Sequence, residues 1–240
     1  MARETHPEAT PFTSDLTPPV RGFLHRPAEP SPNALVLTHG AGANCETALL
    51  TALATIFAGA SFTVLRCDLP YRQKRPHGPP FRGDAARDRQ GLRNAVMALK
   101  EIALQGSRIF LGGHSYGGRQ ATLLAAEDPS VADGLLLLSY PLHPPRLPSE
   151  LRTDHFPSLR TPALFVQGTR DPFGSVEEMR AALDLIPART SLVLFEGAGH
   201  DLLPARRAAP TREGAAGSAQ RAFEAFCAFF GSPQAIKPDQ

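Results

Sequence analysis

Short runs of apolar residues recur along the 240-residue chain, and polar or helix-forming segments separate them. A continuous apolar run is typical of a strand that is buried on both faces of a parallel sheet. We predict such strands at Ala34–Thr38, Ser61–Cys67, the run from Arg108 to Gly113, Gly134–Leu138, Pro162–Gln167 and Ser191–Phe195. A shorter edge strand is expected around Val20–Leu24.

The segments between these strands carry apolar residues at helical spacing, as at Leu92, Val96 and Leu99. Helices are predicted over Glu46–Ala58, Ala85–Leu104, Gln120–Glu127, Ser175–Leu185 and Gln220–Phe230. Strands that alternate with helices indicate an α/β fold, with a mostly parallel sheet and helices on both faces. Ligands of such sheets bind at the carboxyl ends of the strands.

The length suits a single domain, because 240 residues bury about 70–75% of their unfolded surface and can form one good core. Residues 1–18 hold scattered prolines and charges without periodicity. We therefore expect a flexible N-terminal arm over 1–18, one domain over 19–231 and a C-terminal tail over 232–240. Loops are expected over Leu69–Gly83, Ser139–Thr161 and Pro204–Ser218.

The composition limits the kinds of partner that we expect the chain to bind. Lys and Arg number 25 and Asp and Glu 23, so the net charge of +2 offers no reason to expect nucleic acid or a membrane as partner. Three widely spaced cysteines argue against a disulfide framework and fit a reducing cytoplasm. The first 19 residues lack the apolar core of a secretory signal. We expect a soluble cytoplasmic protein that acts on a small molecule, and its oligomeric state stays open.

The stretch from Arg108 to Gly118 carries the candidate nucleophile. It contains the pattern Gly-x-Ser-x-Gly, with Ser115 at its centre, where a predicted strand meets a predicted helix. An ordinary glycine-rich turn can show the same pattern, but this context favours a nucleophile elbow. Gly113 and Gly117 remove side chains that would collide at so sharp a turn. Ser115 is therefore the predicted nucleophile.

A serine hydroxyl needs a base to take its proton and a carboxylate to hold that base. Asp171 follows one predicted strand and His200 the next, so both are expected at the same sheet edge as Ser115. The order Ser, Asp, His, with gaps of 56 and 29 residues, is that of α/β-hydrolases. The alternatives are an aspartate that caps a turn before Pro172 and a plain loop histidine. Asp201 is expected to be a solvated neighbour.

The tetrahedral intermediate of acyl transfer carries an oxyanion, which needs backbone N–H donors. We expect one from Tyr116, directly after the nucleophile, and one from Ala41, in the glycine-rich loop after the first buried strand. A flexible strand-to-helix turn is the alternative for this loop. His39 is expected to hold the loop by a hydrogen bond, and His114 is expected to pack.

Neither a metal nor a cofactor is expected. The chain has no H-E-x-x-H, no C-x-x-C and no histidine pair at helical spacing. It also lacks a phosphate loop, and Gly40-Ala-Gly42 lacks the third glycine of a dinucleotide fingerprint. Cys45 is expected to pack as a small apolar residue.

Together these residues resemble the α/β-hydrolase superfamily over Ala34–Phe230, and within it the small capless group similar to dienelactone hydrolase. The segments Leu138–Pro145, Leu151–Phe156 and Leu164–Gly174 are similar to a subgroup of small bacterial proteins related to a testis-expressed vertebrate protein and to the hydrolase-like domain of a chromatin-complex subunit. The subgroup implies the fold, and its eukaryotic relatives imply that the scaffold can also serve binding. Dienelactone hydrolases proper use a cysteine where this chain has Ser115.

Residues 139–161 are too few for the helical cap that many members of the superfamily insert, so an open site without a cap domain is expected. Four residues are candidates for substrate binding: Tyr71, Arg72, Tyr140 and His143. Residues 72–93 carry seven basic and two acidic side chains, which indicates either a solvated face or a preference for anionic esters. The predicted function is a carboxylesterase-like serine hydrolase of small esters, and the alternative is a non-catalytic interaction module.

Overall fold

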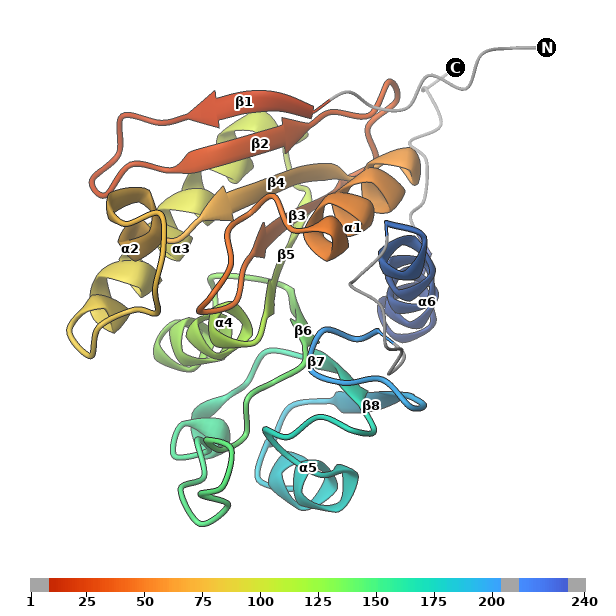
Figure 1. Cartoon of the computed structure of the whole chain (residues 1–240). Helices are drawn as coiled ribbons and strands as arrows, with labels where there is room; N and C mark the ends of the chain where they lie inside the picture. Colours follow the sequence, from red (N-terminus) through yellow and green to blue (C-terminus); the bar gives the residue numbers. More distant parts are fainter. Residues whose placement is uncertain (1–8, 204–211, 233–240) are drawn as a thin grey trace.

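One mixed sheet forms the centre of the computed structural model, which describes residues 9–203 and 212–232. Within these ranges the strands pair in the order β1-β2-β4-β3-β5-β6-β7-β8 (Figure 1). Their bounds are β1 Ala9–Thr13, β2 Arg21–His25, β3 Asn33–Thr38, β4 Thr63–Asp68, β5 Arg108–His114, β6 Gly134–Leu138, β7 Ala163–Gly168 and β8 Thr190–Phe195. From β4 to β8 all neighbours are parallel, and β1 and β2 are antiparallel at one edge. The predicted α/β fold with a mostly parallel sheet is confirmed.

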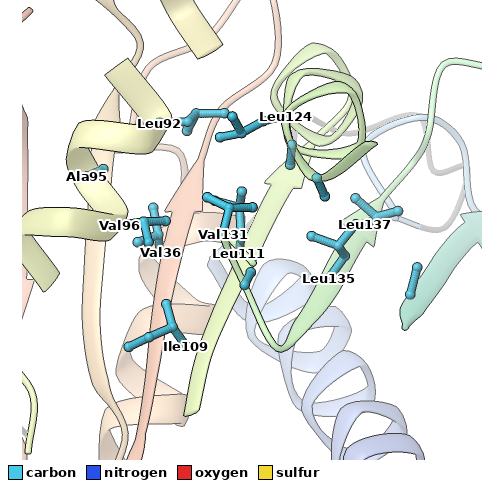
Figure 2. Close-up of a cluster of buried hydrophobic side chains, with 14 of the residues drawn as sticks. Val36, Leu92, Ala95, Val96, Ile109, Leu111, Leu124, Val131, Leu135 and Leu137 are labelled. Carbon is cyan, nitrogen blue, oxygen red and sulfur yellow. The ribbon is translucent and has the colours of Figure 1, made fainter. Parts of the chain in front are cut away.

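Helices cover both faces of the sheet. The α-helices are α1 Ala48–Gly59, α2 Pro70–Lys74, α3 Asp84–Ile102, α4 Tyr116–Glu127, α5 Val176–Leu183 and α6 Arg212–Phe230, and η1 Phe156–Ser158 is a 3-10 turn. Buried residues of α3, α4 and α5 belong to one apolar cluster, part of which Figure 2 shows. Buried residues of α1 and α6 belong to a second cluster on the opposite face.

The central strands supply side chains to both clusters, because successive residues of a strand point to opposite faces. In β6, Leu135 and Leu137 lie in the α3 and α4 cluster (Figure 2), whereas Leu136 and Leu138 lie in the α1 and α6 cluster. All five residues of β6 are buried. This double burial is the reason that the strands appear in the sequence as continuous apolar runs.

The N-terminal arm that we expected to be flexible contains a strand. Residues 9–13 form β1 and pair with β2 through the register Ala9 to His25. The strand is short, partly exposed and polar in part, so it has no apolar alternation that could have indicated it. Residues 1–8, the rest of the arm before β1, lie outside the described chain, as does the predicted tail apart from Ser232.

Two expected loops also contain helix. The loop predicted over Leu69–Gly83 includes α2, which begins with Pro70 at a position where proline is well tolerated. Of the loop predicted over Pro204–Ser218, residues 204–211 are not described, and α6 already begins at Arg212. Gly214 and Gly217 lie in this first part of α6, and glycine is a poor helix former, which hid the extension.

The segment from 139 to 162 between β6 and β7 contains only η1 as a helical element, so no cap domain is inserted there. In the described part of the chain, no helix combines the length and the apolar character needed to cross a membrane.

Candidate active site

Ser115 lies at the turn between β5, which ends at His114, and α4, which begins at Tyr116. Its backbone has φ 51° and ψ −116°, a conformation that residues with a side chain rarely adopt. Two hydrogen bonds hold this backbone. The Ser115 amide donates to the Leu138 carbonyl over 2.8 Å, and the Arg119 amide donates to the Ser115 carbonyl over 3.0 Å. The sharp strand-to-helix turn expected from the sequence is therefore present and restrained on both sides.

Glycines make this turn possible. A Cβ atom at Gly117 would lie 2.6 Å from the His39 carbonyl oxygen, and one at Gly113 would lie 2.6 Å from the backbone of Gly117. Such approaches are far closer than van der Waals contact allows. The prediction that these two positions need glycine is confirmed. Gly118 joins them, since its Cβ would lie 2.8 Å from the Gly113 carbonyl oxygen.

The structure brings Ser115, His200 and Asp171 into one line of hydrogen bonds. His200 Nε2 lies 2.8 Å from Ser115 Oγ, and His200 Nδ1 lies 2.8 Å and 3.0 Å from the two carboxylate oxygens of Asp171. The Asp171 side chain is fully buried, whereas the His200 side chain is 23% exposed. A carboxylate beside Nδ1 favours the tautomer that carries its proton there, which leaves Nε2 free to accept the serine proton.

Further contacts orient Asp171. Gln167 Nε2 donates to Asp171 Oδ2 and the Phe173 amide donates to Oδ1, each over 2.9 Å. The Phe173 ring also lies on the imidazole of His200, with centroids 4.2 Å apart and planes 32° apart. The sequence reading missed the role of Phe173. The only feature of the sequence that could have indicated this role is the position of Phe173 two residues after the predicted acid, Asp171.

His114 does more than pack. Its Nε2 lies 2.7 Å from the carbonyl oxygen of His200, and the two rings are 5.2 Å apart. Burial, and then the charge of His200, lower the pKa of His114 to about 4, so the ring is neutral at pH 7. Because the carbonyl can only accept, the neutral ring carries its proton on Nε2 and donates to it. His114 thus connects the turn at Ser115 to the backbone of His200.

The loop after β3 lies against Ser115. A Cβ at Gly40 would be 3.4 Å from Ser115 Cβ and 2.9 Å from His114 Nδ1, so the loop approaches the turn closely. As expected, His39 holds this loop. Its Nε2 accepts a hydrogen bond from the Leu69 amide over 3.1 Å, and its Nδ1 donates to the Gly40 carbonyl over 2.9 Å.

The two amides expected to hold an oxyanion have no hydrogen-bond partner within residues 9–203 and 212–232. These are the N–H groups of Ala41 and Tyr116. The neighbouring amide of Gly117 is occupied, because it donates to the His39 carbonyl over 3.1 Å. The site therefore offers unpaired donors at both positions that the sequence predicted.

Tyr71 and Arg72 do not lie on an open cleft surface, and their predicted role in substrate binding needs correction. They are 1% and 5% exposed. The Tyr71 hydroxyl lies 3.2 Å from the Gly40 carbonyl oxygen and 2.9 Å from that of Ala41. The Arg72 guanidinium donates to the carbonyl groups of Ala41, Ala43, Arg75 and Gly78. Both side chains bind backbone of this chain instead of facing a ligand.

Tyr140 and His143 are also occupied inside the fold. Tyr140 is fully buried between Phe156 and Phe165, and its hydroxyl donates to the Arg152 carbonyl over 2.7 Å. No surface of Tyr140 is available to a ligand, so its predicted role in substrate binding also needs correction. His143 is nearly buried, with its two ring nitrogens near the Pro144 carbonyl and the Glu178 carboxylate.

Acidic side chains neutralise much of the basic segment at residues 72–93. Arg75 pairs with Asp84 over 2.6 Å. Arg89 pairs with Glu127 over 2.9 Å, and Arg93 pairs with Asp128. With Arg72 buried and these three paired, the exposed cations of the segment without an ion-pair partner among the described residues are Lys74, Arg82 and Arg87, which leaves less support for a preference for anionic esters.

Two further chemistries, a metal site and a reactive Cys45 thiol, have no support in the described residues. No group of three or more His, Cys, Asp or Glu residues that could hold a metal ion is found within residues 9–203 and 212–232. Burial, followed by the nearby charge of Asp68, raises the pKa of the Cys45 thiol to about 12. A buried thiol that stays protonated fits the packing role expected for Cys45.

Gly117→Ala should destabilise the protein by about 1–3 kcal/mol, because its new Cβ meets the His39 carbonyl oxygen at 2.6 Å. Gly217→Ala is the matched control. Gly217 is an exposed residue of α6 with open space around its Cβ position, so the same change should stabilise by about 0.5–1 kcal/mol. Urea unfolding measures both. Equal effects at the two sites would contradict the close approach at Gly117.

The free energy of unfolding should fall as the pH drops from 6.5 to 4, in part because of His114. Its pKa is about 4 in the folded protein and about 6.5 in the unfolded chain, so only the unfolded chain takes up this proton in that window. The stability from this group is therefore complete above pH 6.5 and decreases by about 1.4 kcal/mol per pH unit below it.

In His114→Gln, the slope of unfolding free energy against pH between 6 and 5 should be shallower by that amount. Denaturant unfolding at pH 8 serves as the reference. At this pH His114 is neutral in the folded and the unfolded protein, so the difference in unfolding free energy reports the lost hydrogen bond alone. Parallel pH profiles of the two proteins would contradict the lowered pKa.

Comparison with known proteins identifies the family of this chain. The model of a family described as "Alpha/beta hydrolase domain" matches residues 31–228. A curated relative from Escherichia coli K12, named "Putative carboxymethylenebutenolidase", is 32% identical over 119 residues, which cover 45% of this chain and 42% of the relative. A Salmonella typhimurium relative with the same name is 32% identical over 119 residues, 45% of this chain and 43% of its own. The matched region thus spans less than half the length of these relatives.

Solved structures share the fold over nearly the whole chain. A dienelactone hydrolase from Anabaena variabilis has a TM-score of 0.71 and 20% identity, covering 93% of this chain and 99% of its own. A Xanthomonas campestris protein described as an α/β serine hydrolase without lid has a TM-score of 0.67 and 17% identity, covering 91% and 95%. With the family model matching most of its length, this chain belongs to the alpha/beta hydrolase family.

Proposed function

We propose that this protein is a serine hydrolase of small carboxylic esters that works through an acyl-enzyme. The observation that carries the proposal is the line of hydrogen bonds from Ser115 through His200 to the buried Asp171, at a turn with φ 51°. Each atom has the distance and the partner that its role requires. The unpaired amides of Ala41 and Tyr116 beside it support the same function.

In the proposed reaction, Ser115 Oγ attacks the ester carbonyl carbon while His200 Nε2 takes the hydroxyl proton. The carbonyl oxygen becomes an oxyanion and accepts hydrogen bonds from the amides of Ala41 and Tyr116. The imidazolium of His200, held by Asp171, then gives its proton to the departing alcohol, which leaves an acyl-serine. Water then attacks the acyl-serine carbonyl carbon while His200 Nε2 takes its proton. The C–Oγ bond breaks, His200 returns the proton to Ser115 Oγ, and the carboxylic acid leaves.

For the substrate we propose short, uncharged acyl esters. Without an inserted cap, the site buries little apolar area, so a long acyl chain gains little at about 25 cal/mol per Å². Burial of Arg72 and the pairing of Arg75, Arg89 and Arg93 weaken the reason to expect anionic selectivity. The names of the relatives point to lactones, which are cyclic esters, as substrates of those proteins, and we extend only the wider ester class to this chain.

The alternative, a non-catalytic interaction module on the same fold, requires no aligned acid, base and nucleophile. Burying the Asp171 carboxylate beside His200 costs desolvation free energy, and a binding scaffold gains nothing from this arrangement. The narrower resemblance to proteins related to a chromatin-complex subunit, and the cytoplasmic location, stay predictions of the sequence.

A fluorophosphonate probe should label the folded protein at Ser115, because the activated hydroxyl attacks the probe's phosphorus as it would an ester carbonyl. Intact mass and peptide mapping measure the adduct. Heat-denatured protein and Ser115→Ala are the controls and should take no label. Absence of label on well-folded protein would overturn the proposed nucleophile and favour the interaction module.

Asp171→Asn should lower kcat by about 10⁴, because the amide holds His200 in the wrong tautomer while leaving the fold in place. Asp201→Asn is the matched control. Asp201 is the exposed neighbour of His200, and among the described residues its Oδ1 accepts the Leu203 amide. Turnover of 4-nitrophenyl acetate by Asp201→Asn should stay within about twofold. A loss below tenfold in Asp171→Asn would assign the acid elsewhere.

Among 4-nitrophenyl esters, acetate and butyrate should show higher kcat/KM than octanoate, because a site without a cap buries little of a long acyl chain. The series measures acyl-chain preference at constant leaving group. A steady rise of kcat/KM with chain length would instead require an apolar tunnel beside Ser115.

A further inference from the structure

The carbonyl groups of the loop after β3 are held by side chains from α2. In a trans peptide the carbonyl and the following amide point in opposite directions. The carbonyl of Gly40 therefore sets where the Ala41 amide points. It accepts hydrogen bonds from His39 Nδ1 over 2.9 Å and from the Ala43 amide over 3.1 Å, and the Tyr71 hydroxyl lies 3.2 Å away, so these donors hold the carbonyl on the Tyr71 side of the loop. The Ala41 amide then points away from this side and has no partner in the described chain.

Arg72 holds the next part of the same loop. Its Nη2 donates to the Ala41 carbonyl over 3.1 Å and its Nε to the Ala43 carbonyl over 2.7 Å. The Tyr71 hydroxyl also lies 2.9 Å from the Ala41 carbonyl. A planar guanidinium with donors in fixed directions can hold two carbonyls at a fixed separation. Together Tyr71 and Arg72 restrain the peptide groups on both sides of Ala41.

A buried carboxylate on α3 connects this clamp to the nucleophile turn. Asp88 is fully buried. Its Oδ1 accepts the Tyr71 amide over 3.0 Å, and its Oδ2 accepts the Tyr116 hydroxyl over 2.8 Å. The rings of Tyr71 and Tyr116 meet at right angles, with centroids 5.8 Å apart. One carboxylate thus ties the residue that follows Ser115 to the residue that clamps the loop of Ala41.

The pKa of the Asp88 carboxyl reflects the cost of burying it. Burial raises the pKa of this carboxyl above its usual range, while the hydrogen bonds from Tyr116 and Tyr71 act in the opposite direction. A buried carboxyl with few neighbours of opposite charge is costly for stability alone. A role in the geometry of the site explains its place between the two halves of the oxyanion hole.

We propose that Asp88, Tyr71 and Arg72 are positioning residues that set the distance and direction of the two oxyanion-binding amides, Ala41 and Tyr116. The inference rests on the proposed serine hydrolase function and adds residues that do not touch the substrate. Asp88 acts through Tyr71 and Tyr116, and Tyr71 and Arg72 act through the carbonyls of the loop.

The test uses Tyr71→Phe, Arg72→Lys and the pair Asp88→Ala and Asp88→Asn in the full chain. Tyr71→Phe removes one hydroxyl, and Arg72→Lys cannot hold two carbonyls in one plane. Asp88→Asn keeps an acceptor for the Tyr71 amide and can donate to Tyr116, so it should rescue much of what Asp88→Ala loses. Asn94→Ala is the matched control, because Asn94 also lies buried on α3 and donates to a backbone carbonyl, that of Pro18.

Three readouts are compared with wild type: kcat and KM for 4-nitrophenyl acetate, the inhibition constant of a short alkyl boronic acid, and active sites counted by fluorophosphonate. The boronate forms a tetrahedral adduct with Ser115 and so reports the oxyanion hole. We expect kcat per active site to fall about tenfold or more in Tyr71→Phe, Arg72→Lys and Asp88→Ala, with KM within about twofold. Boronate affinity should weaken in parallel, while Asn94→Ala should leave both values unchanged.

A purely structural role would lower the number of labelled sites without changing the boronate inhibition constant, and that result would overturn the proposal. If Tyr71→Phe does not fold, Arg72→Lys carries the same test, since Arg72 also donates to the Ala41 carbonyl. Wild-type protein without label or turnover would instead overturn the serine hydrolase function, and the positioning role with it. An active wild type with unchanged variants would overturn the positioning role alone.

Discussion

The hydrogen bond from the Gly117 amide to the His39 carbonyl joins the start of α4 to the end of β3, and the geometry of the site depends on this contact. It requires the two chain segments to meet with no side chain between them, since a Cβ at Gly117 would lie 2.6 Å from the His39 oxygen. Because of it, the turn that carries Ser115 and the loop that carries Ala41 lie side by side. Ser115 then adopts φ 51° at a strained turn whose cost the neighbouring sheet and helix offset.

Buried polar side chains around this contact bind backbone groups as well as one another. Asp171 accepts the Phe173 amide, Asp88 accepts the Tyr71 amide, and Arg72 donates to four carbonyls. Each of these bonds satisfies a group that would otherwise be costly to bury, and each also fixes a peptide plane. The surroundings of the proposed catalytic groups are thus rigid, which suits a site whose donors must be in place before an oxyanion forms.

The sequence predicted the fold well because the central strands are buried on both faces. Double burial leaves continuous apolar runs, and β3 to β8 fall within a few residues of the runs that indicated them. Elements without such a pattern were missed. β1 is a polar edge strand stabilised by backbone pairing, α2 is a single short helix among prolines, and the first part of α6 contains glycines. Their stability comes from neighbours that are distant in sequence.

For the site, chain order and glycine spacing were enough to indicate Ser115, Asp171 and His200, since each follows a strand and parallel strands end at one edge of the sheet. Sequence alone also located the loops of Ala41 and Tyr116. It could not decide where the side chains between them point. Only the tertiary structure turned Tyr71, Arg72 and Tyr140 from candidate ligand contacts into buried groups that hold backbone. It likewise placed Phe173 on His200 and His114 against the His200 carbonyl. The reason is physical: a motif specifies local backbone and chemistry, whereas the direction of a side chain depends on which neighbours the whole fold brings to it.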